Sequence, residues 1–489
     1  MLSVTCEHAA SAVMSTRDRR RRAVEQEGIQ VNILIVNTTA ITRLAPAVPR
    51  RVALNAAVLR EAGYEVDVLD LCFSKNIRGA VETACREARV DVIIAAVDRY
   101  EALCQDRPDM ARLKTVFERI RAVHTGPLVI CGSCMAEAPV DMIRLCNADF
   151  GIVGETEAVL PEVVGRLASG GDWRQLSPLP GVLWRELLDA CDPGVWNVQL
   201  NELPLPAMEG FAPEYGGWTP PRVAIEPLRT WGVETRRGCP YDCPNCRVPQ
   251  LHGPIIRTRS MDGIIDEIDK MIADHQVREW FLLDRHFQFP YRHITELCHS
   301  LSGRAQFASW TAFTCNGLES VDLDMLHEMK AAGCDAIVAT IPSLHDDIIA
   351  SMGKTYTVEH VVRFSGYVKR AGMRLMLVAT VGYPEESIRM LEDTLTILED
   401  IAPPHLVLEI GLTLSRGSLM DKELAQIALG GEDPLEPARF VSTNFEPKQL
   451  ARLMGRFSRK HEDWWFRSAF GEPWLDSTIA AVRRLHAKS

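Results

Sequence analysis

The sequence predicts an α/β protein: a doubly wound, Rossmann-like parallel sheet, then a partial β/α (TIM-like) barrel and a C-terminal helical segment. Three observations predict this fold class. Apolar runs alternate with amphipathic stretches over 31–168, a segment rich in Pro, Gly and Trp interrupts the pattern, and the alternation then resumes. We therefore expect five parts: a disordered leader at 1–30, a Rossmann-like domain at 31–168, a linker at 169–230, a barrel at 231–430 and a helical region at 431–489.

The first block contains five apolar runs that have the length of buried parallel strands. We expect strands at 31–36, 64–71, 91–97, 127–132 and 150–155, with helices at 51–62, 77–88, 110–124 and 156–168. Ligands of such sheets lie beyond the carboxyl ends of the strands. The candidate ligand-binding loops therefore begin at Asn37, Asp98, Gly132 and Gly154.

The second block repeats the alternation six times, which predicts an incomplete barrel with its chemistry at the carboxyl ends of the strands. We expect strands at 231–236, 279–284, 307–312, 335–340, 373–381 and 405–411, with helices at 261–274, 291–302, 321–332, 357–371 and 387–400. The last part, 446–486, has a helical pattern. We expect Trp464, Trp465 and Trp474 to form the core of that helical unit.

Composition excludes several classes of protein. The chain has 489 residues, a formal net charge of −11 and 24% charged residues, so a nucleic-acid partner, which needs a positive surface, is not expected. No apolar run reaches the ~18 residues of a membrane span. The first residues lack the apolar core of a signal peptide. We therefore expect a cytoplasmic protein whose 14 cysteines are mostly reduced.

Three cysteines follow the first predicted strand of the second block, in VETRRGCPYDCPNCRVP at 233–249. Cys239, Cys243 and Cys246 have the spacing C-x3-C-x2-C, and Gly238 favours a tight turn before them. A cubane iron–sulfur cluster is usually held by four thiolates, one on each iron. Three thiolates would therefore leave one iron open to another ligand.

Three other interpretations of the triplet remain, and chance clustering among the 14 cysteines is one of them. A structural zinc site, in a non-catalytic metal-binding protein, would need a fourth Cys or His, and His252 is the nearest. A disulfide with one spare thiol would need an oxidising compartment. Elsewhere, His286, Cys315, Cys334, Tyr356 and Tyr383 lie near predicted strand ends, where packing or surface exposure is the commoner role, so none of them is given a function.

The triplet at the end of a first barrel strand resembles the radical S-adenosylmethionine (SAM) superfamily. Within that superfamily, the chain resembles the subgroup with an N-terminal cobalamin-binding domain. This resemblance implies that the three cysteines hold a [4Fe-4S] cluster whose open iron binds the amino and carboxylate groups of SAM. One electron, from a reducing protein such as flavodoxin or ferredoxin, would then cleave SAM to methionine and a 5′-deoxyadenosyl radical. The family often has an aromatic residue before the last cysteine, where this chain has Asn245.

Further segments carry the same resemblance, namely FLLDRHF at 281–287, LHEMKAAGCDAIVATIPSLHDDIIASMGKTYT at 326–357 and LVATVGYPEES at 377–387. They imply that SAM is bound by Tyr241, Asp284, Ser343 and Gly382, with Asp284 on the amino group. A helix N-cap is the alternative role of Asp284. The family commonly has Gly-x-Glu-Ser where this chain has 340–343, Thr-Ile-Pro-Ser, so the glutamate contact is missing.

The first block resembles the cobalamin-binding domain in ALNAAVLREAGYEVDVLDL at 53–71 and ADFGIVGETE at 148–157. Classical members ligate cobalt through Asp-x-His-x-x-Gly after the first strand. This chain has no histidine between His8 and His124, so that loop supplies no lower ligand. Cobalamin bound without a histidine, and a vestigial domain that binds nothing, are both open. The family's Gly-Gly is Cys131-Gly132-Ser133-Cys134 here, and we expect its C-x2-C pair to be buried cysteines.

The resemblance implies a cobalamin-dependent methyltransferase that acts on an unactivated carbon of a small-molecule or natural-product substrate. One SAM would methylate the cobalamin and a second would yield the radical. A radical SAM cyclase, a rearrangement enzyme or a radical-addition enzyme with a vestigial cobalamin domain is the alternative. A non-catalytic metal-binding protein is the third possibility.

Overall fold

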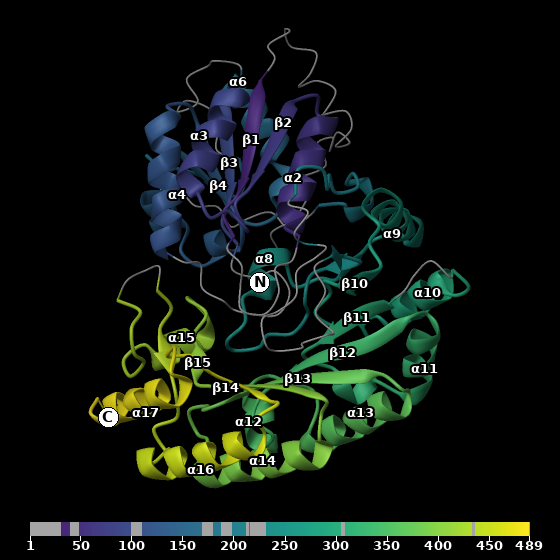
Figure 1. The fold of residues 1–489 in the computed structure, drawn as a ribbon, viewed down its shortest axis with the longest axis vertical. Coiled ribbons are helices and arrows are strands. Elements are labelled where there is room, and N and C mark those ends of the chain that lie inside the picture. Colours follow the sequence, from purple (N-terminus) through teal and green to yellow (C-terminus); the bar gives the residue numbers. More distant parts are fainter. Residues whose placement is uncertain are drawn as a thin grey trace, which may run out of the picture.

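The computed structural model describes residues 31–39, 48–98, 110–168, 179–186, 198–211, 215, 231–304, 309–432 and 436–488. These residues form two large, mainly parallel sheets, one above the other in Figure 1, each flanked by helices. The leader expected at 1–30, and much of the linker expected at 169–230, lie outside the described residues.

The first sheet has the strand order β2-β1-β3-β4-β5-β6. Its first five strands are parallel, as predicted. They are β1 (Asn32–Asn37), β2 (Glu65–Asp70), β3 (Val92–Ala96), β4 (Leu128–Cys131) and β5 (Phe150–Ile152). The order reverses between β1 and β3, which is the usual ligand-binding point of a doubly wound sheet.

Both faces of this sheet are covered, because apolar side chains point to both sides of each strand. Ile33 and Ile35 belong to one buried cluster, and Leu34 and Val36 belong to another. Helices α2 (Arg50–Glu61) and α6 (Leu160–Ala168) cover the first cluster. Helices α3 (Ile77–Glu87), α4 (Met110–Val123) and α5 (Pro139–Leu145) cover the second.

The sixth strand, β6 (Val182–Trp184), lies where the sequence predicts an irregular linker. It pairs antiparallel with β5, and the Trp184 ring meets the Phe150 ring edge to face at 4.3 Å. Three residues between turns are too few to show a strand period. Tertiary pairing, not local pattern, therefore defines this strand.

The second sheet has the order β17-β14-β13-β12-β11-β10-β7, and all its pairings are parallel. Its predicted strands are β7 (Gly232–Val233), β10 (Glu279–Leu282), β11 (Ser309–Thr314), β12 (Cys334–Ile341), β13 (Arg374–Val381) and β14 (His405–Ile410). The predicted helices between them are α9 (Met261–His275), α10 (Tyr291–Leu301), α11 (Leu323–Ala331), α13 (Val358–Arg370) and α14 (Ile388–Ile401). Among the described residues, β17 and β7 are the two edges of this sheet and do not pair with each other, so the barrel is partial, as predicted.

The C-terminal region is not purely helical, because a seventh strand, β17 (Trp465–Ser468), adds to the edge of β14. It lies between α16 (Pro447–Lys460) and α17 (Trp474–His486). Trp464 is buried and stacks on His461 at 4.0 Å, and Trp474 stacks on Phe466. Trp465, expected inside a helical core, instead belongs to the strand and is only partly buried.

Buried ion pairs join the two sheet units. Arg50, at the start of α2, forms a bidentate pair with Glu267 of α9. Arg237, in β8 (Arg236–Arg237), binds Glu157 at 2.8 Å and Glu234 at 2.9 Å. Buried charges are tolerated only when they are paired, so this network fixes the first unit against the barrel.

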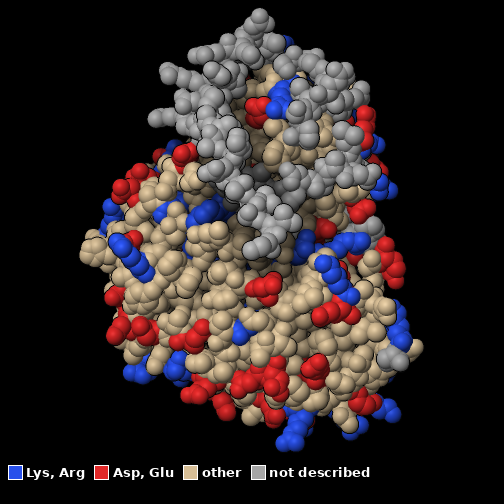
Figure 2. Space-filling view, turned by 180° about the vertical axis from the view of Figure 1, so that it is seen from behind, with Lys and Arg blue, Asp and Glu red and all other residues tan. Residues whose placement is uncertain are grey.

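The surface carries charges of both signs. Figure 2 shows acidic and basic side chains interspersed over the barrel, with acidic ones gathered toward its lower part. Among the described residues on that face, no continuous basic surface is visible. None of the helices in the described ranges is long and apolar enough to span a membrane.

Replacing Glu267→Ala should lower the free energy of unfolding by about 3–5 kcal/mol, because it leaves Arg50 and Arg259 buried without their carboxylate. Urea denaturation of the apoprotein measures the change. The control is Glu296→Ala, which removes an exposed i,i+4 pair with Arg292 and should cost no more than about 0.5 kcal/mol. Equal losses in the two variants would contradict a structural role for the network.

Candidate functional site

A cavity of about 380 Å³ lies between the carboxyl ends of the two sheets. The first unit contributes Asp98, after β3, and Ser133, after β4. The barrel contributes the cysteine loop and the ends of β10 to β14. Both sheets thus point their ligand-binding edges at one space, as their fold classes predict.

The backbone fixes the cysteine loop at its base. Gly238 has φ +96°, and a Cβ there would lie 2.0 Å from the Ile255 carbonyl oxygen, so only glycine fits. The Cys239 N–H donates to the Gly253 carbonyl at 3.1 Å. Antiparallel pairing of β8 with β9 (Arg257–Thr258) closes the loop. Helix α8 (Val248–His252) then leads out of it.

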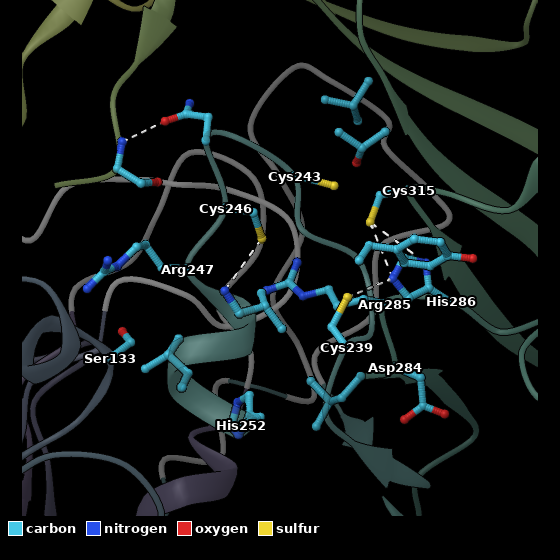
Figure 3. Close-up of a pocket in the computed structure, with 18 of the residues that line it drawn as sticks. Ser133, Cys239, Cys243, Cys246, Arg247, His252, Asp284, Arg285, His286 and Cys315 are labelled. Carbon is cyan, nitrogen blue, oxygen red and sulfur yellow. Dashed lines mark hydrogen bonds between the residues drawn. The ribbon is translucent and has the colours of Figure 1, made fainter. Parts of the chain in front are cut away.

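The thiols of Cys239, Cys243 and Cys246 all line the cavity and point toward a common space in Figure 3. Burial raises the pKa of each thiol, and that of Cys239 to about 12. The Lys354 ammonium, 3.9 Å from the Cys243 sulfur, acts in the opposite direction on that thiol. Since thiolates are the ligands of iron, a bound cation would have to replace these protons.

The donor set fits a cubane cluster better than a single ion. Within the described residues, no three His, Cys, Asp or Glu side chains converge closely enough to hold one metal ion. A cubane instead places each thiolate on a different iron. His252, the nearest candidate for a fourth zinc ligand, lies on α8 away from the sulfur atoms in Figure 3.

Two of the predicted SAM-binding residues, Tyr241 and Asp284, line the cavity. The Tyr241 ring meets the His286 imidazole edge to face at 5.0 Å. Asp284 accepts the Thr235 N–H at 3.0 Å and the Thr235 hydroxyl, and it lies 3.6 Å from Arg236. Helix α10 begins after Pro290, so the alternative of an N-cap role for Asp284 is wrong.

The other two, Ser343 and Gly382, lie behind the cavity wall. The Ser343 hydroxyl donates to Glu386 at 2.6 Å, and the Gly382 N–H donates to the same carboxylate at 2.5 Å. Neither residue is among those that line the cavity. Their contact with SAM stays a prediction, and the described role of both is to fix the turns after β12 and β13.

The sequence analysis missed the basic residues of the cavity. Arg236 has a side chain only 5% exposed, and within the described structure its Nη1 and Nη2 have no hydrogen-bond partner. Lys354 and Arg51 also line the space. The sequence could have indicated them, because Arg236 and Arg237 directly precede the cysteine loop and a guanidinium group there lies close to the cysteines.

The first unit offers a shaped wall to the same space. The Asp98 carboxylate accepts the Ser133 N–H at 2.6 Å and pairs with Arg51 at 3.3 Å. Gly132 has φ +118°, and a Cβ there would lie 2.4 Å from the Val97 carbonyl oxygen. Cys131 and Cys134 are buried in separate clusters, as expected of packing cysteines.

Comparisons with known proteins agree with this architecture. Residues 233–398 match the model of the radical SAM superfamily. The chain is 22% identical over 447 residues to the tryptophan 2-C-methyltransferase of Streptomyces laurentii, covering 78% of this chain and 72% of that protein. It is 23% identical over 313 residues to an uncharacterized methyltransferase of Pyrococcus horikoshii, covering 63% of this chain and 64% of that protein, just under two thirds.

The fold is similar to that of a radical SAM methyltransferase, TsrM from Kitasatospora setae, solved with cobalamin and a [4Fe-4S] cluster bound. The TM-score is 0.72 at 15% identity, over 94% of this chain and 99% of that one. The matched region begins at the strand before the cysteine loop and ends in α14. Over residues 233–398 this chain is therefore similar to the radical SAM superfamily, and its fold is similar to that of a radical SAM methyltransferase.

Proposed function

We propose that the protein is a cobalamin-dependent radical SAM methyltransferase that acts on a carbon atom of a small-molecule substrate. One observation carries the proposal: loops of the Rossmann-like unit and the three-cysteine loop of the barrel line the same cavity. Similarity to a tryptophan 2-C-methyltransferase and to a cobalamin-binding neighbour supports it. When bound, the cluster would supply an electron to SAM and the cobalamin would carry the methyl group.

The residues of the chain would hold and orient these groups. Cys239, Cys243 and Cys246 would bind three irons. The Nη1 and Nη2 groups of buried Arg236, which have no hydrogen-bond partner among the described residues, would donate to a carboxylate of SAM or of the substrate. Ser133 and Asp98 would face the cobalamin from the other wall. No histidine would reach the cobalt from β1, which ends at Asn37, or from the residues after it, because the sequence has none between His8 and His124.

The partners follow from the same chemistry. A small reducing protein, such as a flavodoxin or ferredoxin, would supply the electron. A net charge of −11 and the interspersed surface charges of Figure 2 favour a small-molecule substrate over a nucleic acid. A cytoplasmic location would keep the cysteines reduced.

Anaerobic reconstitution of a Cys239→Ala, Cys243→Ala, Cys246→Ala variant should give almost no bound iron or sulfide, because a cluster needs these thiolates. Iron and sulfide analysis with the visible absorption spectrum measures the loading. Cys85→Ala is the matched control, since Cys85 is half-buried in α3 outside the cavity, and it should load as the unchanged chain does. Full iron content in the triple variant, or zinc in place of iron, would overturn the proposal.

Cobalamin should remain on the unchanged chain through gel filtration, and Ser133→Phe should weaken its binding at least about tenfold, because the ring would fill the wall of the cavity. Titration followed by the cobalamin spectrum gives both affinities. Thr115→Phe, on α4 outside the cavity, is the control and should bind normally. Methyl transfer would fail as a proposal if no cobalamin bound, or if SAM gave 5′-deoxyadenosine without any S-adenosylhomocysteine.

A further inference from the structure

A fourth cysteine shares the cavity with the three of the loop. Cys315 directly follows β11 and lines the cavity together with Cys239, Cys243 and Cys246. In Figure 3 the Cys315 sulfur points into the space that the other three sulfur atoms surround. The cysteine spacing did not reveal it, because Cys315 lies 69 positions after Cys246 in the sequence.

Two polar side chains place Cys315 against the cluster loop. The Nε2 atom of His286 lies 3.4 Å from the Cys239 sulfur and 4.0 Å from the Cys315 sulfur. These two sulfur atoms can therefore be no more than 7.4 Å apart, the sum of the two distances. The Lys354 ammonium donates to the Cys315 carbonyl oxygen at 2.9 Å and lies 3.9 Å from the Cys243 sulfur.

The backbone around Cys315 is held firmly. The Asn316 side-chain oxygen accepts the N–H groups of Gly317 and Thr355, and its amide donates to the Gly353 carbonyl at 3.2 Å. The Thr314 hydroxyl donates to the Asn316 carbonyl at 3.0 Å. Cys315 is thus presented to the cavity by a fixed turn.

The other cysteines of the barrel outside the loop behave differently. Cys298 and Cys334 are fully buried in the apolar core of the sheet and do not line the cavity. Cys315 is only partly buried, beside an imidazole and an ammonium group. Packing therefore explains the first two thiols and leaves the position of Cys315 unexplained.

We propose that Cys315 is an exchangeable fourth ligand of the iron–sulfur cluster, bound to the fourth iron when SAM is absent and displaced when SAM binds. The inference rests on the proposed cluster at Cys239, Cys243 and Cys246. The exchange moves no electrons: the Cys315 thiol gives its proton to solvent when it forms the iron–sulfur bond. The Cys315 thiolate takes up a proton again when the amino and carboxylate groups of SAM replace it on the iron. This ligand would protect the otherwise open iron from loss.

Controlled oxidation tests the ligand directly. An iron that lacks a thiolate is lost on mild oxidation with ferricyanide, and the remaining [3Fe-4S] cluster is counted by its electron paramagnetic resonance signal. Without SAM, the unchanged chain and the Cys85→Ala control should give little of this signal. Cys315→Ala, loaded with the same amount of iron, should give several-fold more, and Cys315→Ser should fall between.

Mössbauer spectra of the same samples test the exchange. In the unchanged chain, the addition of SAM should convert one iron of the four from a thiolate-ligated to a distinct site. In Cys315→Ala that iron should already be distinct before SAM is added. Equal [3Fe-4S] yields in both proteins, or a distinct iron in the unchanged chain without SAM, would overturn the inference and leave the proposed function intact. If the unchanged chain bound no cluster at all, that result would instead contradict the proposed function.

Discussion

The buried charge network between the two units is the constraint on which the rest of the structure depends. Arg237 is its centre, bound to Glu157 of the first unit and to Glu234 of the barrel. Burial alone would raise the pKa of Glu234, but Arg237 and Arg50 outweigh burial and lower it to about 2. The carboxylate is therefore charged throughout the neutral range. Arg237 also precedes Gly238 and Cys239, so the contact that joins the units also fixes the start of the cysteine loop.

The charge inside the cavity differs from that of the whole chain. The chain carries a net charge of −11, yet eight Arg or Lys residues and five Asp or Glu residues line the cavity. Thiolates on iron and the carboxylate of SAM are negative, and a low-dielectric site strengthens their attraction to fixed cations. Arg236, whose pKa burial lowers, bears its charge beside Cys239, and within the described residues its ion-pair partner is Asp284. The excess of positive charge therefore suits an anionic cofactor set.

Strands within the regular alternation of apolar runs and helical patterns were predictable from the sequence, and strands outside it were not. The strands from β1 to β5 and from β10 to β14 lie in such apolar runs, even where the strand itself has only three or four residues. β6 and β17 lie in the predicted linker and the predicted helical region, and only pairing with a neighbouring strand defines them. The cysteine loop was predictable because the C-x3-C-x2-C spacing itself indicates cluster ligands. Arg50 and Glu267 are 217 residues apart, so no local pattern could reveal their contact.

Glu155 and Glu157 lie on the first unit, and their arginine partners Arg257 and Arg237 lie on the barrel. A chimera that joined this barrel to the Rossmann-like half of another protein would deprive these guanidinium groups of their glutamate partners across the interface and leave them only acceptors on the barrel, such as Glu234 for Arg237 and the His252 carbonyl oxygen for Arg257. Such a graft would have to carry both glutamates with it. The contact residues of the two units must therefore change together. A new substrate specificity is more readily gained by changes in the loops that line the cavity than by exchange of a whole unit.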